Sequence, residues 1–171
     1  TTPESFAYCL KEAIFDRVPF HGVYFLKGTA DDLEAECSRY SRLLTQFPAD
    51  IVCMGIGENG HIAFNDPHVA DFKDPAAVKT VDLDRVSRQQ QVHDGCFATL
   101  AEVPVSALTL TVPSLLKARY VYCIVPGSKK AQAVYHTLNS ETKEDYPSTA
   151  LRNHPRAVLY LDEDSASKIE Q

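Results

Sequence analysis

The chain has 171 residues, and its 17 basic against 23 acidic side chains give a formal net charge of −6. This balance argues against a general nucleic-acid-binding surface but leaves room for a local cationic pocket that binds a small anion. Hydrophobic residues make up 44% of the sequence, which excludes a disordered chain, and no stretch reaches the roughly 20 apolar residues that span a membrane.

Segments with helical periodicity alternate with short apolar runs along the whole chain. The expected elements are a helix over 5–15, a strand over 23–26, a helix over 30–47, a strand over 51–54, strands over 78–83 and 107–112, a helix over 113–118, a strand over 120–125, a helix over 129–138, a strand over 157–161 and a short helix beginning at 162–165. Thr29 is expected to cap the second helix, and Pro113 suits the first turn of the third.

Strands that alternate with helices predict a mostly parallel sheet. We therefore expect an α/β fold with a Rossmann-like, mostly parallel sheet and helices on both faces, built as a single domain over residues 1–171. The chain begins with a helix instead of an opening βα unit, so the sheet is expected to lack its N-terminal βα units.

Five cysteines are scattered through the sequence without a Cys-x-x-Cys pair or a preceding secretory segment. This odd number suits reduced thiols in the cytoplasm. Cys53 and Cys123 lie inside apolar runs, where a thiol acts as a small hydrophobic group.

The segment from Gly55 to Pro67 is the most informative part of the sequence. It follows an apolar run directly, and glycines such as Gly57 and Gly60 allow the backbone to turn sharply and to approach a bound substrate closely. The glycines also have the spacing of a dinucleotide-binding loop, but no convincing acid ends a following strand, so we expect no cofactor. No metal ion is expected either.

His61 is bracketed by the polar side chains of Asn59 and Asp66. An imidazole that titrates near neutrality, among groups able to orient it, is suited to general acid and base catalysis. Two simpler interpretations stay open from spacing alone: His61 could cap the loop backbone, and residues 65–67 could form a plain turn.

Residues 60–67, Gly-His-Ile-Ala-Phe-Asn-Asp-Pro, resemble the Gly-His-Ile-Ala-Phe-Asn-Glu-Pro signature of glucosamine-6-phosphate deaminases. That family shares a wider superfamily with 6-phosphogluconolactonases, whose loop is similar only as far as the histidine. Further similar segments follow in the family's order, at 3–5, 32–37, 107–111, 126–131 and 151–155.

The resemblance implies a reaction in which the pyranose ring of an amino-sugar phosphate opens, a proton moves between C2 and C1, and ammonia is released. It implies that His61 assists ring opening. Asn59 stands where many members carry an aspartate that pairs with this histidine, and Asp66 stands where many carry a glutamate. An amide can hold an imidazole tautomer but cannot stabilise imidazolium as a carboxylate does.

The resemblance also implies a phosphate site. Lys130 matches the family's phosphate-binding lysine and follows Gly127 and Ser128 at the start of a helix, where an anion is favoured, although a solvated helix lysine is the simpler interpretation. The family's phosphate-binding arginine falls by spacing at His93. Arg88 matches a different arginine of the family, and we expect either side chain to reach the phosphate if the loop shifts.

Two features of the family are not found in the sequence: a Gly-Ser/Thr phosphate loop and a Leu-Asp-Glu-Tyr motif whose aspartate abstracts the C2 proton. The resemblance places both before Thr1, so we expect this chain alone to lack that base. A missing N-terminal segment and a homo-oligomer stay open as partners. Two other functions also stay open: a non-catalytic sugar-phosphate-binding or regulatory domain, and a 6-phosphogluconolactonase-like hydrolase.

Overall fold

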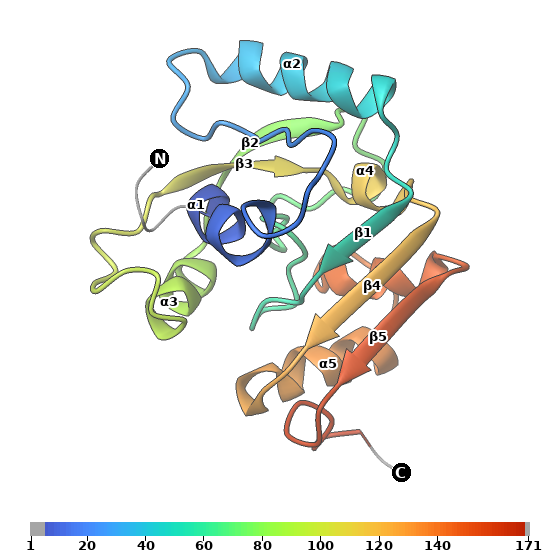
Figure 1. Ribbon diagram of the computed structural model, residues 1–171. Coiled ribbons are helices and arrows are strands. Elements are labelled where there is room, and N and C mark those ends of the chain that lie inside the picture. The colour runs from blue at the N-terminus through green and yellow to red at the C-terminus, as the bar shows by residue number, and fades with distance from the viewer. Residues whose placement is uncertain (1–5, 170–171) are drawn as a thin grey trace.

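The computed structural model describes residues 6–169 of the chain (Figure 1). The strands are β1 (Ile51–Met54), β2 (Val78–Asp82), β3 (Ser106–Leu110), β4 (Tyr120–Val125) and β5 (Ala157–Leu161). The helices are α1 (Phe6–Leu10), α2 (Leu33–Gln46), α3 (Arg85–His93), α4 (Val112–Leu116) and α5 (Ala131–Asn139), together with the π-helix η1 (Lys11–Phe15) and the 3₁₀ helices η2 (Ser128–Lys130) and η3 (Pro147–Asn153).

Three strands form a parallel sheet in the order β1-β4-β5. Val52 of β1 lies opposite Val121 of β4, and Val121 lies opposite Ala157 of β5. These strands are continuous apolar runs in the sequence, which is the pattern of strands in parallel sheets. Because β1 and β4 point the same way, the loops that follow them leave the sheet at the same edge (Figure 1).

The hydrophobic core lies on the face of this sheet that α5 covers (Figure 1). Val121 and Cys123 of β4 are buried there against Val134 of α5. The opposite face is apolar but open within residues 6–169: Tyr160 is 51% exposed and Ile124 is 49% exposed. The predicted α/β fold, a parallel sheet flanked by helices, is confirmed.

The two strands β2 and β3 are not part of the parallel sheet. They pair with each other in an antiparallel two-stranded sheet, with Val78 opposite Leu110. Polar residues interrupt the apolar residues of β2, so that Val78 and Val81 are buried while Thr80 and Asp82 are exposed. Such a half-buried strand suits an antiparallel pair better than the interior of a parallel sheet.

The expected strand at 23–26 is wrong, because this segment has no regular structure. Side chains of α2 hold its backbone instead: Arg39 donates to the Phe25 carbonyl at 2.8 Å, and Glu36 accepts from the Lys27 N–H at 2.7 Å. The helix α2 begins at Leu33 rather than at residue 30, since Asp32, not Thr29, caps it by accepting from the Ala35 N–H.

The expected helix at 162–165 is also wrong. The Asp162 carboxylate accepts the N–H groups of Ser165 and Gly127, and residues 163–168 form turns. The first helix lies within the expected range but continues from α1 as a π-helix, and Ser5 is outside the described residues. None of the helices described between residues 6 and 169 is long and apolar enough to cross a membrane.

Candidate active site

The loop after β1 folds back on itself around His61. The Gly57 N–H donates to the His61 carbonyl at 2.9 Å, and the Gly60 N–H donates to the Gly57 carbonyl at 3.0 Å. Gly60 has a φ of 85°, which a residue with a side chain adopts only under strain. At Gly57 the requirement is space, because an added Cβ would lie 2.1 Å from the imidazole of His61.

Asn59 and Asp66 hold the imidazole from the side of Nδ1. Asn59 Oδ1 lies 2.7 Å from His61 Nδ1 and also accepts the His61 backbone N–H at 3.1 Å. Asp66 Oδ1 lies 3.2 Å from the same ring nitrogen. The structure therefore brings together the three residues that the sequence predicted for acid and base chemistry, and His61 is only 9% exposed.

Asp66 is completely buried. Burial by itself raises the pKa of its carboxyl, but hydrogen bonds from His61, Asn59 and the Asp84 backbone N–H outweigh burial and lower the pKa below its ordinary value. The side chain is therefore a carboxylate that accepts hydrogen bonds on both oxygens.

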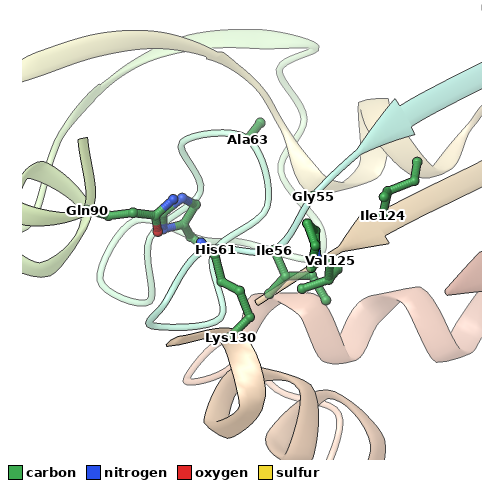
Figure 2. A pocket seen from close by; sticks show the side chains of 10 residues that line it. Gly55, Ile56, His61, Ala63, Gln90, Ile124, Val125 and Lys130 are labelled. Carbon is green, nitrogen blue, oxygen red and sulfur yellow. The ribbon is translucent and has the colours of Figure 1, made fainter. Parts of the chain in front are cut away.

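A pocket with a cavity volume of about 260 Å³ lies where the loops after β1 and β4 meet. Figure 2 shows His61 and Gln90 on one side of this pocket and Lys130 reaching toward it from the start of the helix after β4. The remaining lining residues are Gly55, Ile56, Gly57, Ala63, Ile124, Val125 and Pro126. The site thus lies at the carboxyl edge of the parallel strands, where α/β proteins bind ligands.

Lys130 is the cation of this pocket. Burial lowers the pKa of its ammonium group, while Asp94 and Glu58 act in the opposite direction. Among residues 6–169, no carboxylate lies within ion-pair distance of its Nζ atom. The charge is therefore available to an anion that enters the pocket.

Arg88 and His93 do not line the pocket. The Arg88 guanidinium donates to the carbonyls of Leu100 and Val103, at 2.7 and 2.9 Å, and so holds the 96–105 loop. His93 is exposed at the end of α3, with Nδ1 3.3 Å from Glu58 Oε1. In this arrangement neither side chain reaches the pocket as the expected phosphate ligand.

Two residues of the site were not among those predicted. Gln90 lines the pocket and accepts the Glu58 N–H at 2.8 Å, and nothing in its sequence context distinguishes it. Asp84 accepts from Asn59 at 2.8 Å and caps α3 by accepting the Ser87 N–H. Aspartate is a preferred N-cap residue, so the cap was predictable from the sequence but the contact with Asn59 was not.

A group of potential metal ligands adjoins this network. Ligand atoms of Asp66, His68 and Asp84 lie within 4.8 Å of one another. Both oxygens of Asp66 and of Asp84 already accept hydrogen bonds from Asn59 or from the backbone. The two carboxylates of this group therefore belong to the hydrogen-bond network around His61.

Known proteins share both the sequence and the fold of this chain. A glucosamine-6-phosphate deaminase of Bacillus cereus (strain B4264) is 39% identical over 163 residues, which are 95% of this chain and 60% of that protein. The solved structure of a monomeric glucosamine-6-phosphate deaminase has a TM-score of 0.89 and 32% identity, over 97% of this chain and 68% of that one. The chain thus spans about 60% of the length of the curated relatives that it matches.

The wider superfamily shares the fold alone. A 6-phosphogluconolactonase from Trypanosoma cruzi has a TM-score of 0.71 over 100% of this chain and 69% of that one, but its sequence identity is 17%. The family model described as glucosamine-6-phosphate isomerases/6-phosphogluconolactonase matches residues 1–160. This chain belongs to the glucosamine-6-phosphate isomerase/6-phosphogluconolactonase family.

Proposed function

We propose that this chain takes part in the isomerising deamination of an amino-sugar phosphate, in which glucosamine 6-phosphate and water give fructose 6-phosphate and ammonia. The observation that carries the proposal is a buried, oriented imidazole, His61, in the same pocket as the unpaired ammonium of Lys130. The deaminase names of the relatives support the choice of substrate. The free cysteines of the described residues support a cytoplasmic location.

His61 is suited to opening the sugar ring. Its Nδ1 atom faces two acceptors, so this nitrogen carries the hydrogen and Nε2 carries the lone pair. Within the described part of the chain, Nε2 has no hydrogen-bond partner. It can take the proton of the anomeric hydroxyl and return a proton to the ring oxygen, which opens the ring with no net change in charge.

Lys130 is suited to binding the phosphate. Its ammonium group offers three donors, and a charge-assisted hydrogen bond to phosphate is roughly twice as strong as a neutral one. The lysine lies where η2 passes into α5, and the positive end of a helix dipole favours an anion there.

The base that abstracts the C2 proton is assigned to no residue of this chain. Asp66, the acid of the signature, uses both oxygens to hold Asn59, His61 and the Asp84 backbone. The resemblance gives the role to the aspartate of a Leu-Asp-Glu-Tyr motif, which the sequence does not contain. We propose that turnover requires this aspartate from another polypeptide segment.

The test is an ammonia-release assay with glucosamine 6-phosphate. The chain is assayed alone and mixed with the purified segment of the Bacillus cereus relative that lies outside the matched region. We expect no ammonia from the chain alone and release on mixing. Full activity of the chain alone would refute the proposal that an essential base is missing from it. If the chain binds the substrate but releases no ammonia, either alone or in the mixture, a non-catalytic sugar-phosphate-binding domain is favoured.

The same assay tests the role of His61. We expect His61→Gln to lower turnover in the mixture by roughly 10² to 10⁴, the usual contribution of a positioned acid or base group. The control is His21→Gln, which changes an exposed histidine far from the loop in sequence. Ammonia release at the wild-type rate by His61→Gln would refute the ring-opening role of His61. If the wild-type protein hydrolyses 6-phosphogluconolactone and releases no ammonia from glucosamine 6-phosphate, it is a lactonase-like enzyme.

A further inference from the structure

Two carboxylates accept the hydrogens of the Asn59 amide nitrogen. Its Nδ2 atom donates to Asp66 Oδ1 at 3.0 Å and to Asp84 Oδ2 at 2.8 Å. A primary amide nitrogen carries two hydrogens, so both are engaged. The amide oxygen is then directed to His61, where it lies 2.7 Å from Nδ1.

This orientation determines the tautomer of His61. Asn59 Oδ1 and Asp66 Oδ1 are both acceptors, and they lie 2.7 and 3.2 Å from Nδ1. Rotating the amide by half a turn would bring its oxygen against the two carboxylates and its NH₂ group against Nδ1. The network therefore favours the neutral imidazole with hydrogen on Nδ1 and a lone pair on Nε2.

Asp84 is itself held firmly. Its Oδ1 atom accepts the Ser87 N–H at 2.6 Å as the N-cap of α3, and its backbone N–H donates to Asp66 Oδ2 at 3.2 Å. The start of α3 thus determines where Oδ2 meets the Asn59 amide.

We propose that Asp84 is a positioning residue for the reaction, because it locks Asn59 in the orientation that keeps His61 in the Nδ1–H tautomer. The catalytic part of this inference rests on the proposed ring-opening function of His61. The inference also accounts for an amide at position 59, since a carboxylate there would lie within hydrogen-bond distance of the carboxylates of Asp66 and Asp84.

Three variants test the proposal. Asp84→Asn removes the charge but keeps a residue that caps helices well, so a purely capping role predicts no effect. Asn59→Asp brings three carboxylates together. The double variant Asn59→Asp/Asp84→Asn exchanges amide and carboxylate. It keeps an acceptor toward His61 and gives position 59 a donor from the new amide at position 84, while the carboxylates of positions 59 and 66 remain neighbours. Asp82→Asn, which neutralises an exposed carboxylate on β2, is the control.

The primary readout is the ring-nitrogen NMR spectrum of His61, recorded where the ring is neutral, because it needs no turnover. We expect wild type and Asp82→Asn to show hydrogen on Nδ1 alone, Asp84→Asn to show a second population with hydrogen on Nε2, and the double variant to lose that population. Circular dichroism and thermal unfolding confirm that each variant is folded.

The second readout is turnover in the mixture with the complementing segment. We expect Asp84→Asn to lower kcat about 10-fold or more, the usual effect of a residue that orients a functional side chain, with KM unchanged. An unchanged His61 tautomer in Asp84→Asn, or a double variant that keeps the population with hydrogen on Nε2, would overturn the proposal. If the His61 tautomers change as expected but neither the wild type nor any variant releases ammonia, the positioning network is supported and the proposed deaminase function is refuted.

Discussion

Replacing Gly57 by alanine tests the close approach between the loop backbone and His61. The added Cβ would lie 2.1 Å from Cε1, 2.2 Å from Nδ1 and 2.4 Å from Nε2 of the imidazole. Ordinary contact begins at 3.4 Å, so the ring must move by about 1.3 Å or rotate away. Gly57 does not have a positive φ, so alanine adds no backbone strain of its own.

The hydrogen bond between His61 Nδ1 and Asn59 Oδ1 is 2.7 Å long, and a displacement of this size would break it. A misplacement of about 1 Å costs roughly 10²-fold in rate, so we expect turnover to fall roughly 10²- to 10³-fold. The cost in the free energy of unfolding is expected to be about 1–3 kcal/mol, the effect of leaving a buried polar group without its partner.

Turnover is measured by ammonia release in the mixture with the complementing segment, ring position by the NMR signals of His61, and stability by urea unfolding. Gly28→Ala is the control, because an added Cβ there meets no heavy atom within 4 Å. In a His61→Ala background the stability cost of Gly57→Ala should fall close to zero, since the two effects share one contact. Wild-type turnover with unshifted His61 signals in Gly57→Ala would refute the reasoning.

Three further outcomes follow from the structure. Lys130→Ala is expected to weaken binding of a sugar 6-phosphate by roughly 1.5–3 kcal/mol without changing binding of the unphosphorylated sugar. Calorimetry measures both affinities, with Lys129→Ala, which changes an exposed lysine, as the control. Equal losses of affinity for both ligands would indicate a structural role of Lys130. The hydrogen bond from Arg39 is the main cause that lowers the pKa of Glu36 from 4.5 to about 2, so the stability that Glu36 contributes is complete above pH 4.5 and is lost as the pH falls toward 2. In urea unfolding, Glu36→Gln should therefore have a free energy of unfolding roughly 1.5–3 kcal/mol below that of the wild type at neutral pH, and this difference should disappear in acid. The control Glu34→Gln, on the exposed side of α2, should show no such difference. A difference for Glu36→Gln that persists in acid would contradict the role of the ion pair. The open apolar face of the parallel sheet predicts that the chain associates with itself. The double variant Val158→Lys/Tyr160→Lys should lower the apparent molecular mass measured by light scattering, whereas the control Leu138→Lys on α5 should not. The same apparent mass for both variants would place the contact elsewhere on the molecule.

Local patterns in the sequence were enough to predict the elements that frame the site. The apolar runs at 51–54, 120–125 and 157–161 are strands, as expected. Alternate side chains of each strand belong to the hydrophobic core or pack against it. Pro113 lies in the first turn of α4, as expected. The loop sequence from Asn59 to Asp66 placed His61 beside these two side chains, because all three lie within one short loop.

Contacts between distant segments were decided only by the tertiary structure. Asp84 and Gln90 reach the loop around His61 because β2 and α3 pack beside it, and no pattern near either residue encodes that approach. Arg88 lies only two residues before Gln90 along α3, yet its guanidinium binds the carbonyls of the 96–105 loop. A helix directs neighbouring residues to different sides, so the packing of α3, not the residue type, decides which of its polar side chains enters the pocket.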